Sequence, residues 1–262
     1  MELIAYIFIF LFGMAVGSFL NCLIYRLEIG EKPTGSSFCP SCKHDLSVKD
    51  LIPVFSYIFL KGECRYCGEK ISIQYPLVEI FTGVVFLATL LFFGIPYSYI
   101  EVVRVVLTLI AFSLLVVVFV YDLKHFIIPN KIIYPAIGTA FLLALIEGVT
   151  SESLFVFLNY IAVGAVFFAF FLAIYLLTKG KGIGFGDVRY SLFLGFFLGF
   201  PEGLVALFFS FVIGAIIGVI LMASGSKGRK DAIPFGPFLV IGTFAGFFLG
   251  ELLLNLYFSI LL

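Results

Sequence analysis

Long runs of apolar residues alternate along the chain with short polar stretches. A helix needs about 20 apolar residues to cross roughly 30 Å of hydrocarbon. By that measure the candidate membrane spans number eight, near residues 3–25, 77–95, 99–121, 131–147, 154–178, 187–200, 203–223 and 236–260. The pattern therefore predicts an all-α polytopic membrane protein.

Two of these runs are unusual. The first, at 3–25, has the position of a signal peptide, but no basic segment leads it and no obvious small-residue cleavage site follows, so we interpret it as a retained span. The sixth, at 187–200, holds only 14 residues. We expect its start to dip below the membrane surface inside a cavity lined by protein.

The composition agrees with a membrane protein. Hydrophobic residues make up 62% of the chain and charged residues only 12%, whereas soluble domains carry about 25% charged residues. The mean hydropathy is +1.20. Sixteen basic residues balance sixteen acidic ones, so the net charge indicates no nucleic-acid partner, and only the placement of charge is informative.

Basic residues fall almost wholly on alternate connections. The connections that together hold fifteen of the sixteen are 26–76, 122–131, 179–189 and 224–233. Because Lys and Arg are enriched on the cytoplasmic side, these connections are predicted to face the cytoplasm and both termini to face outward. The predicted organisation is a first transmembrane helix at 1–25, a small cytoplasmic module at 26–76 and a transmembrane body at 77–262.

Four of the five cysteines lie in this module, as Cys39 and Cys42 in "CPSC" and Cys64 and Cys67 in "CRYC", with 21 residues between the pairs. Two such knuckles can close a tetrahedral thiolate shell around zinc. A loop of about 50 residues builds little core, so a metal would stabilise it. Two disulfides are an alternative that a reducing cytoplasm disfavours. A third interpretation is a loop that has lost its metal and is held by packing alone.

Asp122 and Asp187 differ from the other acidic residues near the spans, most of which lie at predicted outer ends in solvent. Asp122 closes the third run in "VYDLKHFIIPN" and Asp187 opens the sixth in "GFGD", both at cytoplasmic ends. A carboxylate in such a place is costly and rarely idle. The two residues are 65 positions apart, yet they are predicted at one depth and on one side, so they can meet.

Two carboxylates that meet within a few ångströms repel each other and share one proton near neutral pH. One can then deprotonate a water for attack on a peptide carbonyl while the other protonates the departing amide. Gly182, Gly184 and Gly186 fit this use, because residues without Cβ allow tight turns and close approach of a substrate. From these residues alone, an aspartyl protease stands behind an ion- or proton-coupled transporter that uses both aspartates as a relay.

The order of several motifs resembles that of the prepilin peptidases, also called type IV leader peptidases. These are "GSFLNCLIYRL" at 17–27, the paired CxxC loop with "DLIPVFSYIFLKGECRYCGEKISIQYPLVE", "YDLKHFIIPN", "GIGFGDVR" and "IPFGPFL" at 233–239. The resemblance covers nearly the whole chain and implies an intramembrane aspartyl protease with Asp122 and Asp187 as its catalytic pair. Typical bacterial members also N-methylate the newly exposed first residue. Gly236, in the last motif, is expected to let that segment approach the catalytic turn.

The resemblance also implies partners and a methyl donor. The substrates would be prepilins or pseudopilins, cut at the cytoplasmic surface of the bacterial inner membrane, and the module is expected to help position the leader or the donor. The donor would be S-adenosylmethionine, although no glycine-rich nucleotide-binding fingerprint is present. Asn21, Arg26 and Glu79 are candidates for donor binding, because they are polar groups at cytoplasmic span ends. Helix capping or interfacial anchoring explains each of them equally well.

Overall fold

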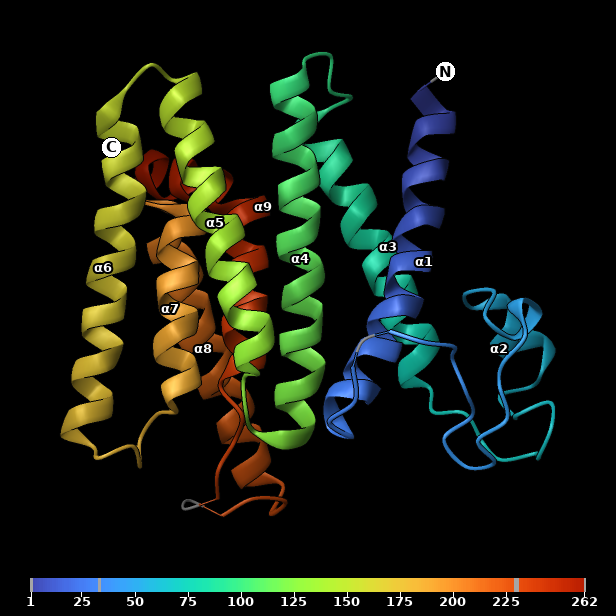
Figure 1. Cartoon of the computed structure of the whole chain (residues 1–262). Coiled ribbons are helices and arrows are strands. Elements are labelled where there is room, and N and C mark those ends of the chain that lie inside the picture. The colour runs from blue at the N-terminus through green and yellow to red at the C-terminus, as the bar shows by residue number, and fades with distance from the viewer. Residues whose placement is uncertain (1, 33, 229–230, 262) are drawn as a thin grey trace. The chain divides into compact units, whose positions relative to one another are not determined.

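A computed structural model describes residues 2–32, 34–228 and 231–261. Arg229 and Lys230, two of the basic residues of the connection at 224–233, lie outside the described residues. The described helices are α1 (Glu2–Glu28), the 3-10 helix η1 (Val48–Asp50), α2 (Phe55–Phe59), α3 (Gln74–Phe93), α4 (Tyr99–His125), α5 (Asn130–Thr150), α6 (Leu154–Leu177), α7 (Phe185–Leu198), α8 (Glu202–Ala223) and α9 (Gly236–Leu261) (Figure 1).

Seven of the described helices are long and apolar enough to cross a membrane, namely α1, α3, α4, α5, α6, α8 and α9. This confirms the all-α polytopic fold, and the predicted ends of the spans lie within four residues of the observed ones. The short run predicted at 187–200 is α7. Its 14 residues extend about 21 Å at 1.5 Å per residue, so α7 reaches only part of the way across about 30 Å of hydrocarbon.

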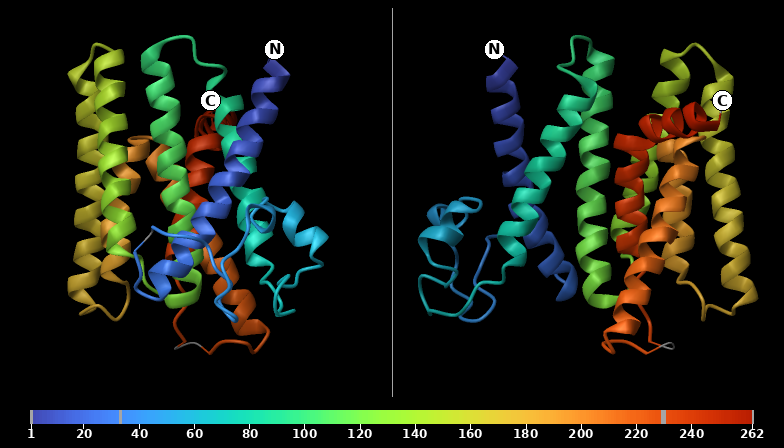
Figure 2. Two further views of the ribbon diagram at one scale, coloured as in Figure 1. Left: turned by 45° about the vertical axis from the view of Figure 1, so that its right-hand side comes forward. Right: turned by 180° about the vertical axis from the view of Figure 1, so that it is seen from behind.

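The chain divides into two compact units, Met1–Val105 and Val106–Leu262, here called unit 1 and unit 2. In unit 1, α1 packs along α3, and the module is the connection between them (Figure 2). Glycines permit this close packing: a Cβ at Gly17 would lie 2.7 Å from the Glu79 Cα. The division at 1–25, 26–76 and 77–262 stays a prediction from the sequence.

In unit 2, α7 is the central helix and packs against α5, α6, α8 and α9. The core is aromatic, as the Phe-rich composition leads one to expect. Phe112 of α4 is fully buried, with its ring centroid 5.5 Å from that of Phe197 on α7 and 4.8 Å from that of Phe244 on α9. Such ring pairs stabilise a core beyond the area they bury. They join α4, α7 and α9, the three helices whose ends carry the polar residues described next.

Candidate active site and metal centre

Asp187 lies in the first turn of α7, where the chain leaves the glycine-rich turn. Its carboxylate Oδ2 accepts the backbone N–H of Gly184 at 3.0 Å, and the residue is only 8% exposed. An acidic residue is favoured here because the first N–H groups of a helix lack intrahelical partners and carry partial positive charge. A Cβ at Gly184 would lie 3.2 Å from this oxygen. The turn is therefore closed tightly onto the carboxylate.

The neighbouring glycines are also close to other groups. A Cβ at Gly182 would lie 2.9 Å from the Thr178 Cγ2, and a Cβ at Gly186 would lie 3.0 Å from the Ile128 Cβ. Ile128 follows the end of α4 by three residues and is buried. The close approach at Gly186 therefore holds the beginning of α7 against the chain that leaves α4, the helix that carries Asp122.

Asp122 lies in the last turn of α4 and is 4% exposed. Its Oδ2 accepts the backbone N–H of Gly236, the first residue of α9, at 3.0 Å. The N-terminus of a helix favours a negative charge. A Cβ at Gly236 would lie 2.5 Å from the same oxygen, so only glycine fits against this carboxylate. The segment expected to approach the catalytic turn is thus in contact with Asp122.

Asp122 and Asp187 lie at neighbouring helix ends of unit 2, because the beginning of α7 at Gly186 touches Ile128, just after the end of α4. Each carboxylate accepts a hydrogen bond from a backbone amide, at the turn before α7 for Asp187 and at the start of α9 for Asp122. Two carboxyl groups so placed can share one proton while both stay hydrogen-bonded. The arrangement can perform acid–base chemistry on a bond brought to these helix ends.

Arg189 has a role that was not foreseen from the sequence. Its guanidinium lies over the rings of Phe185, at 4.5 Å, and Tyr134, at 5.6 Å, and it donates a hydrogen bond to Asn130 Oδ1. The contacts fix the start of α7 to the start of α5 and place a cation two residues from Asp187. The only signal in the sequence is a charged residue in an otherwise apolar helix, which requires a partner.

The three residues considered for methyl-donor binding are all buried in unit 1. Each of them contacts the backbone of the module or of its junction with α3. Asn21 Nδ2 donates to the Tyr75 carbonyl at 3.0 Å, Arg26 donates to the Gly35 and Ser36 carbonyls at 2.9 and 2.7 Å, and Glu79 Oε2 accepts the Val54 N–H at 2.7 Å. These bonds are what interfacial anchoring requires, since a buried polar group needs a partner.

The four predicted metal ligands come together in unit 1. The sulfur atoms of Cys39, Cys42, Cys64 and Cys67 all lie within 4.8 Å of one another, and Cys39 Sγ is 3.9 Å from Cys67 Sγ. Zinc–sulfur bonds of about 2.3 Å give a tetrahedron with edges of about 3.8 Å. The cluster therefore has the size and the donor atoms that zinc prefers. The cysteines are free, and the distance is far longer than the roughly 2.05 Å of a disulfide.

Two knuckles of one design present these thiols. In each knuckle the residue before the first cysteine pairs with a residue seven positions on, the first cysteine donates its N–H to a carbonyl five positions on, and the residue after the second cysteine has a positive φ. In the first knuckle Phe38 pairs with Asp45, the Cys39 N–H donates to the His44 carbonyl, and Lys43 has the positive φ. In the second knuckle Glu63 pairs with Lys70, the Cys64 N–H donates to the Glu69 carbonyl, and Gly68 has the positive φ. The local backbone geometry of each knuckle thus directs its two thiols toward the cluster.

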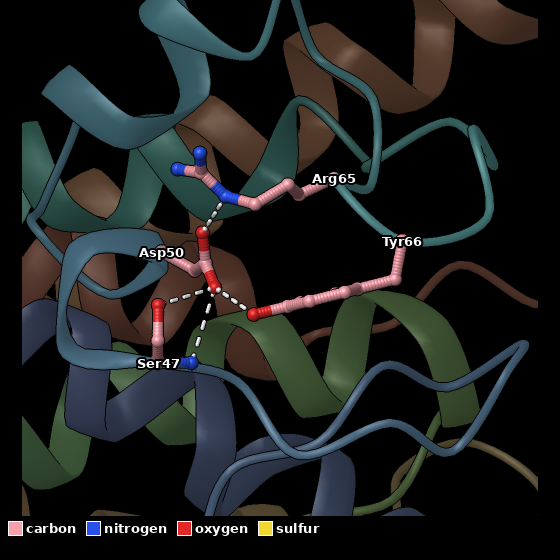
Figure 3. Close-up of polar contacts among 4 residues, drawn as sticks. All are labelled: Ser47, Asp50, Arg65 and Tyr66. Atoms are coloured by element: carbon pink, nitrogen blue, oxygen red, sulfur yellow. Dashed lines mark hydrogen bonds and ion pairs between the residues drawn. The ribbon is translucent and has the colours of Figure 1, made fainter.

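A polar cluster joins the segment before α2 to the second knuckle (Figure 3). Asp50 accepts hydrogen bonds from Arg65 Nε at 2.6 Å, from the Tyr66 hydroxyl at 3.1 Å and from the Ser47 hydroxyl at 2.7 Å. Arg65 and Tyr66 are the two residues between Cys64 and Cys67. Burial raises the pKa of the Asp50 carboxyl, but the hydrogen bonds from Arg65, Ser47 and Tyr66 outweigh it and lower that pKa to about 2.

Family models match the chain in two consecutive segments. The Bacterial Peptidase A24 N-terminal domain matches residues 11–93, and the Type IV leader peptidase family matches residues 109–219. The first segment falls in unit 1 and includes the four cysteines. The second falls in unit 2 and includes Asp122 and Asp187.

Curated relatives match nearly the whole chain. A prepilin leader peptidase/N-methyltransferase of Bacillus subtilis is 32% identical, over 95% of this chain and 96% of its own length. Proteins of the same name from Legionella pneumophila, 31% identical over 96% and 94% of the two chains, and from Aeromonas hydrophila, 28% identical over 95% and 92%, are also similar. No solved structure matches the chain.

Proposed function

Because the chain belongs to the type IV leader peptidase family, we propose that it is a bifunctional membrane enzyme that cleaves the leader from type IV prepilins or pseudopilins and methylates the new amino terminus. Relatives that match over nearly their whole length carry both activities in their names. The observation that supports the peptidase activity is the placement of two buried aspartates, Asp122 and Asp187, at neighbouring helix ends of unit 2. A transporter with an aspartate relay has no support among these relatives.

Asp122 and Asp187 are the proposed catalytic pair, sharing one proton. The ionised carboxylate takes a proton from a water, whose oxygen bonds to the carbonyl carbon of the last leader residue. The protonated carboxyl gives its proton to the amide nitrogen as the C–N bond breaks. The products are a leader that ends in a carboxylic acid, which then loses its proton to solvent, and a pilin with a free amine. The pair again holds one proton, now on the other partner.

The amides of Gly184 and Gly236 are the proposed positioning groups of this pair. Each holds one carboxylate oxygen at 3.0 Å, which leaves the carboxyl group fixed while the proton moves. Positioning of this kind contributes to catalysis because a misplacement of about 1 Å can cost about 100-fold in rate.

The aspartate end of unit 2 is proposed to face the cytoplasm. The connections from α4 to α5, from α6 to α7 and from α8 to α9 begin or end at this group of helix ends, and they are the basic connections of the sequence. The bond between a cytoplasmic leader and a membrane-embedded helix would then be presented directly to Asp122 and Asp187. Under this orientation both termini face outward, and the module lies in the cytoplasm.

Cys39, Cys42, Cys64 and Cys67 are proposed to hold a structural zinc. Once bound, the metal would cross-link the two knuckles and stabilise a module too small to build a core of its own. The module, held between α1 and α3, is proposed to position the leader or the methyl donor.

S-adenosylmethionine is the proposed methyl donor, from which the new pilin amine takes the methyl group. Asn21, Arg26 and Glu79 remain candidates for its binding from the sequence. Their hydrogen bonds to the backbone of the module and its junction favour the alternative, in which they anchor the module.

The test uses purified protein in liposomes, mixed with a prepilin that carries its leader, and the product mass is read. Asp122→Asn and Asp187→Asn should each abolish the loss of the leader. Asp231→Asn, which alters an exposed aspartate of the same unit, should cleave normally. Cleavage retained in either of the first two variants would remove that residue from the pair. A gain of one methyl group upon addition of S-adenosylmethionine tests the second activity.

A further inference from the structure

The module carries an apolar surface that its own fold leaves uncovered. Ile52, Phe55, Ile58 and Phe59, in and before α2, are 47%, 51%, 62% and 81% exposed. Within α2, Phe55, Ile58 and Phe59 follow the spacing of one helix face. Uncovered apolar side chains gathered in this way mark contact with a partner or with a membrane.

We propose that this surface, residues 51–60 and here called the α2 surface, lies in the lipid bilayer, in the leaflet where α1 ends and α3 begins. The module would then be an interfacial element of the membrane rather than a domain suspended in water. The partner is the lipid itself: acyl chains against the apolar side chains and headgroups at the rim.

One hydrogen bond sets the depth of α2. The backbone N–H of Val54, the residue before α2, donates to Glu79 Oε2 at 2.7 Å. Glu79 is five residues, or about 7.5 Å, along α3 from its first residue, Gln74. Since α3 is a membrane span, the chain at Val54 lies beside its membrane-inserted part and not at its tip.

The packing of α1 on α3 gives the same depth. A Cβ at Gly17 would lie 2.7 Å from the Glu79 Cα, so these two residues lie at one level. Gly17 is fifteen residues, or about 22 Å, from the start of α1 at Glu2. Hydrocarbon about 30 Å thick extends beyond that level. Apolar side chains exposed there meet lipid.

The backbone of this segment is suited to such a place, because a chain in hydrocarbon must pair its own polar groups. Pro53 has no N–H, and the N–H of Val54 is bound by Glu79. The next N–H groups fold back on the segment: Ser56 donates to Ile52 O at 3.0 Å, Ile58 to Val54 O at 3.1 Å, Leu60 to Ser56 O at 2.9 Å and Gly62 to Tyr57 O at 2.9 Å.

Two lysines flank the apolar stretch, in "KDLIPVFSYIFLK". Lys49 and Lys61 are exposed. Long basic side chains at the edges of an apolar segment extend toward headgroups while their stems stay in the apolar layer. Their charge also suits anionic phospholipids, which attract basic residues close to the surface. The charge pattern therefore favours a bilayer as the occupant of the α2 surface.

The absence of Trp from the sequence allows a direct test. The full-length protein with Phe59→Trp is reconstituted in vesicles of phosphatidylcholine and phosphatidylglycerol, with either ordinary or brominated acyl chains. Phe81→Trp, on the outer face of the α3 span, is the lipid control, and Glu69→Trp, an exposed charged position of the same module, is the water control. Phe55→Trp repeats the measurement at a second position of the surface.

Brominated lipid should quench Phe59→Trp to within about twofold of Phe81→Trp, and aqueous iodide should quench it far less than Glu69→Trp. Equal quenching of Phe59→Trp and Glu69→Trp by iodide, with none by brominated lipid, would overturn the proposal. Loss of lipid quenching on addition of a prepilin would assign the surface to substrate instead. A rise of lipid quenching as the protein is diluted into more lipid would assign it to a second copy of the chain.

Discussion

The cysteine cluster of unit 1 and the aspartate pair of unit 2 are built in opposite ways. Each cysteine pair is positioned by backbone hydrogen bonds that span at most nine residues, and one design is used twice. At the aspartate pair one contact is of long range: Asp122 is held by an amide 114 residues away, whereas the amide that holds Asp187 belongs to Gly184, three residues before it. Two cysteines of the cluster are exposed, whereas both aspartates are buried.

This difference predicts which kind of change disrupts each site. A site made of local turns keeps its shape when distant packing changes, and it is lost when its metal is lost. A site made where helix ends meet has no local template, so a small displacement of one helix separates its members. The four changes below test this contrast at the metal, at a helix end, beside a knuckle and within the helix packing.

Loss of the metal is the largest expected effect. Cys42→Ser combined with Cys67→Ser removes one thiolate from each knuckle, and structural zinc is worth about 10–16 kcal/mol in small metal-binding modules. Elemental analysis should show one zinc per chain in the parent protein and none in the variant. The fold of unit 2 should persist, while leader cleavage, methylation or both decrease.

Cys22→Ser, which changes the one cysteine outside the cluster, is the control and should keep its zinc. If the double variant cleaved and methylated as well as the parent, the module would have no part in positioning leader or donor.

At the aspartate pair, Gly236→Ala should lower the rate of leader cleavage by about 100-fold, because the added methyl group would push α9 and the Asp122 carboxylate apart. Gly138→Ala is the matched control, since a Cβ there meets nothing within 4 Å. Rates of leader loss and thermal unfolding in detergent are measured for both. Normal cleavage by Gly236→Ala would show that the amide does not position Asp122.

The four-cysteine cluster of unit 1 could be predicted from the sequence, because each CxxC motif forms its turn from neighbouring residues. The spans could be predicted for a similar reason, since length and hydropathy are local properties. The pairing of Asp122 with Asp187 is a prediction that rests on the resemblance to a known family and, among the residues themselves, on an assumption about sidedness drawn from where the basic residues fall. That assumption placed two helix ends on one side of the membrane, but it says nothing about which groups hold them.

The partners of these residues could not be predicted. Nothing in the sequence around Asp122 indicates that the backbone N–H of Gly236 donates a hydrogen bond to its carboxylate. Only the glycine itself indicated a close approach of that segment. Asp50 lies fourteen residues before Cys64 and carries no motif of its own. Such contacts arise when whole elements pack, and a single sequence does not encode them in any short pattern.

Beside the second knuckle, Asp50→Asn should weaken zinc binding by about 10-fold, the lower end of what a supporting hydrogen bond to a metal site contributes. Because the pKa of Asp50 is lowered to about 2, its stabilisation is complete above the unfolded value and is lost only as the pH falls toward 2. The weakening should therefore be the same at about pH 6 and about pH 8. Competition with a chelator measures it.

Asp45→Asn is the control for this change. Asp45 accepts a hydrogen bond from the Ser36 hydroxyl at 2.7 Å, whereas Asp50 accepts from Arg65 and Tyr66, the residues between Cys64 and Cys67. If both variants released zinc equally, the hydrogen bonds of Asp50 would not stabilise the second knuckle.

The smallest effect is expected within the packing of unit 2. Tyr190 is fully buried, and its hydroxyl shares a hydrogen bond of 2.8 Å with Thr243 on α9. Thr243 also donates to the Leu239 carbonyl, so Tyr190→Phe leaves no donor without a partner and should cost about 1 kcal/mol of stability. Cleavage should stay within about twofold of the parent, because amides at the helix ends hold both aspartates. A loss of cleavage as large as that of Gly236→Ala would mean that the packing of α7 on α9, rather than the two amides, sets the distance between the carboxyl groups.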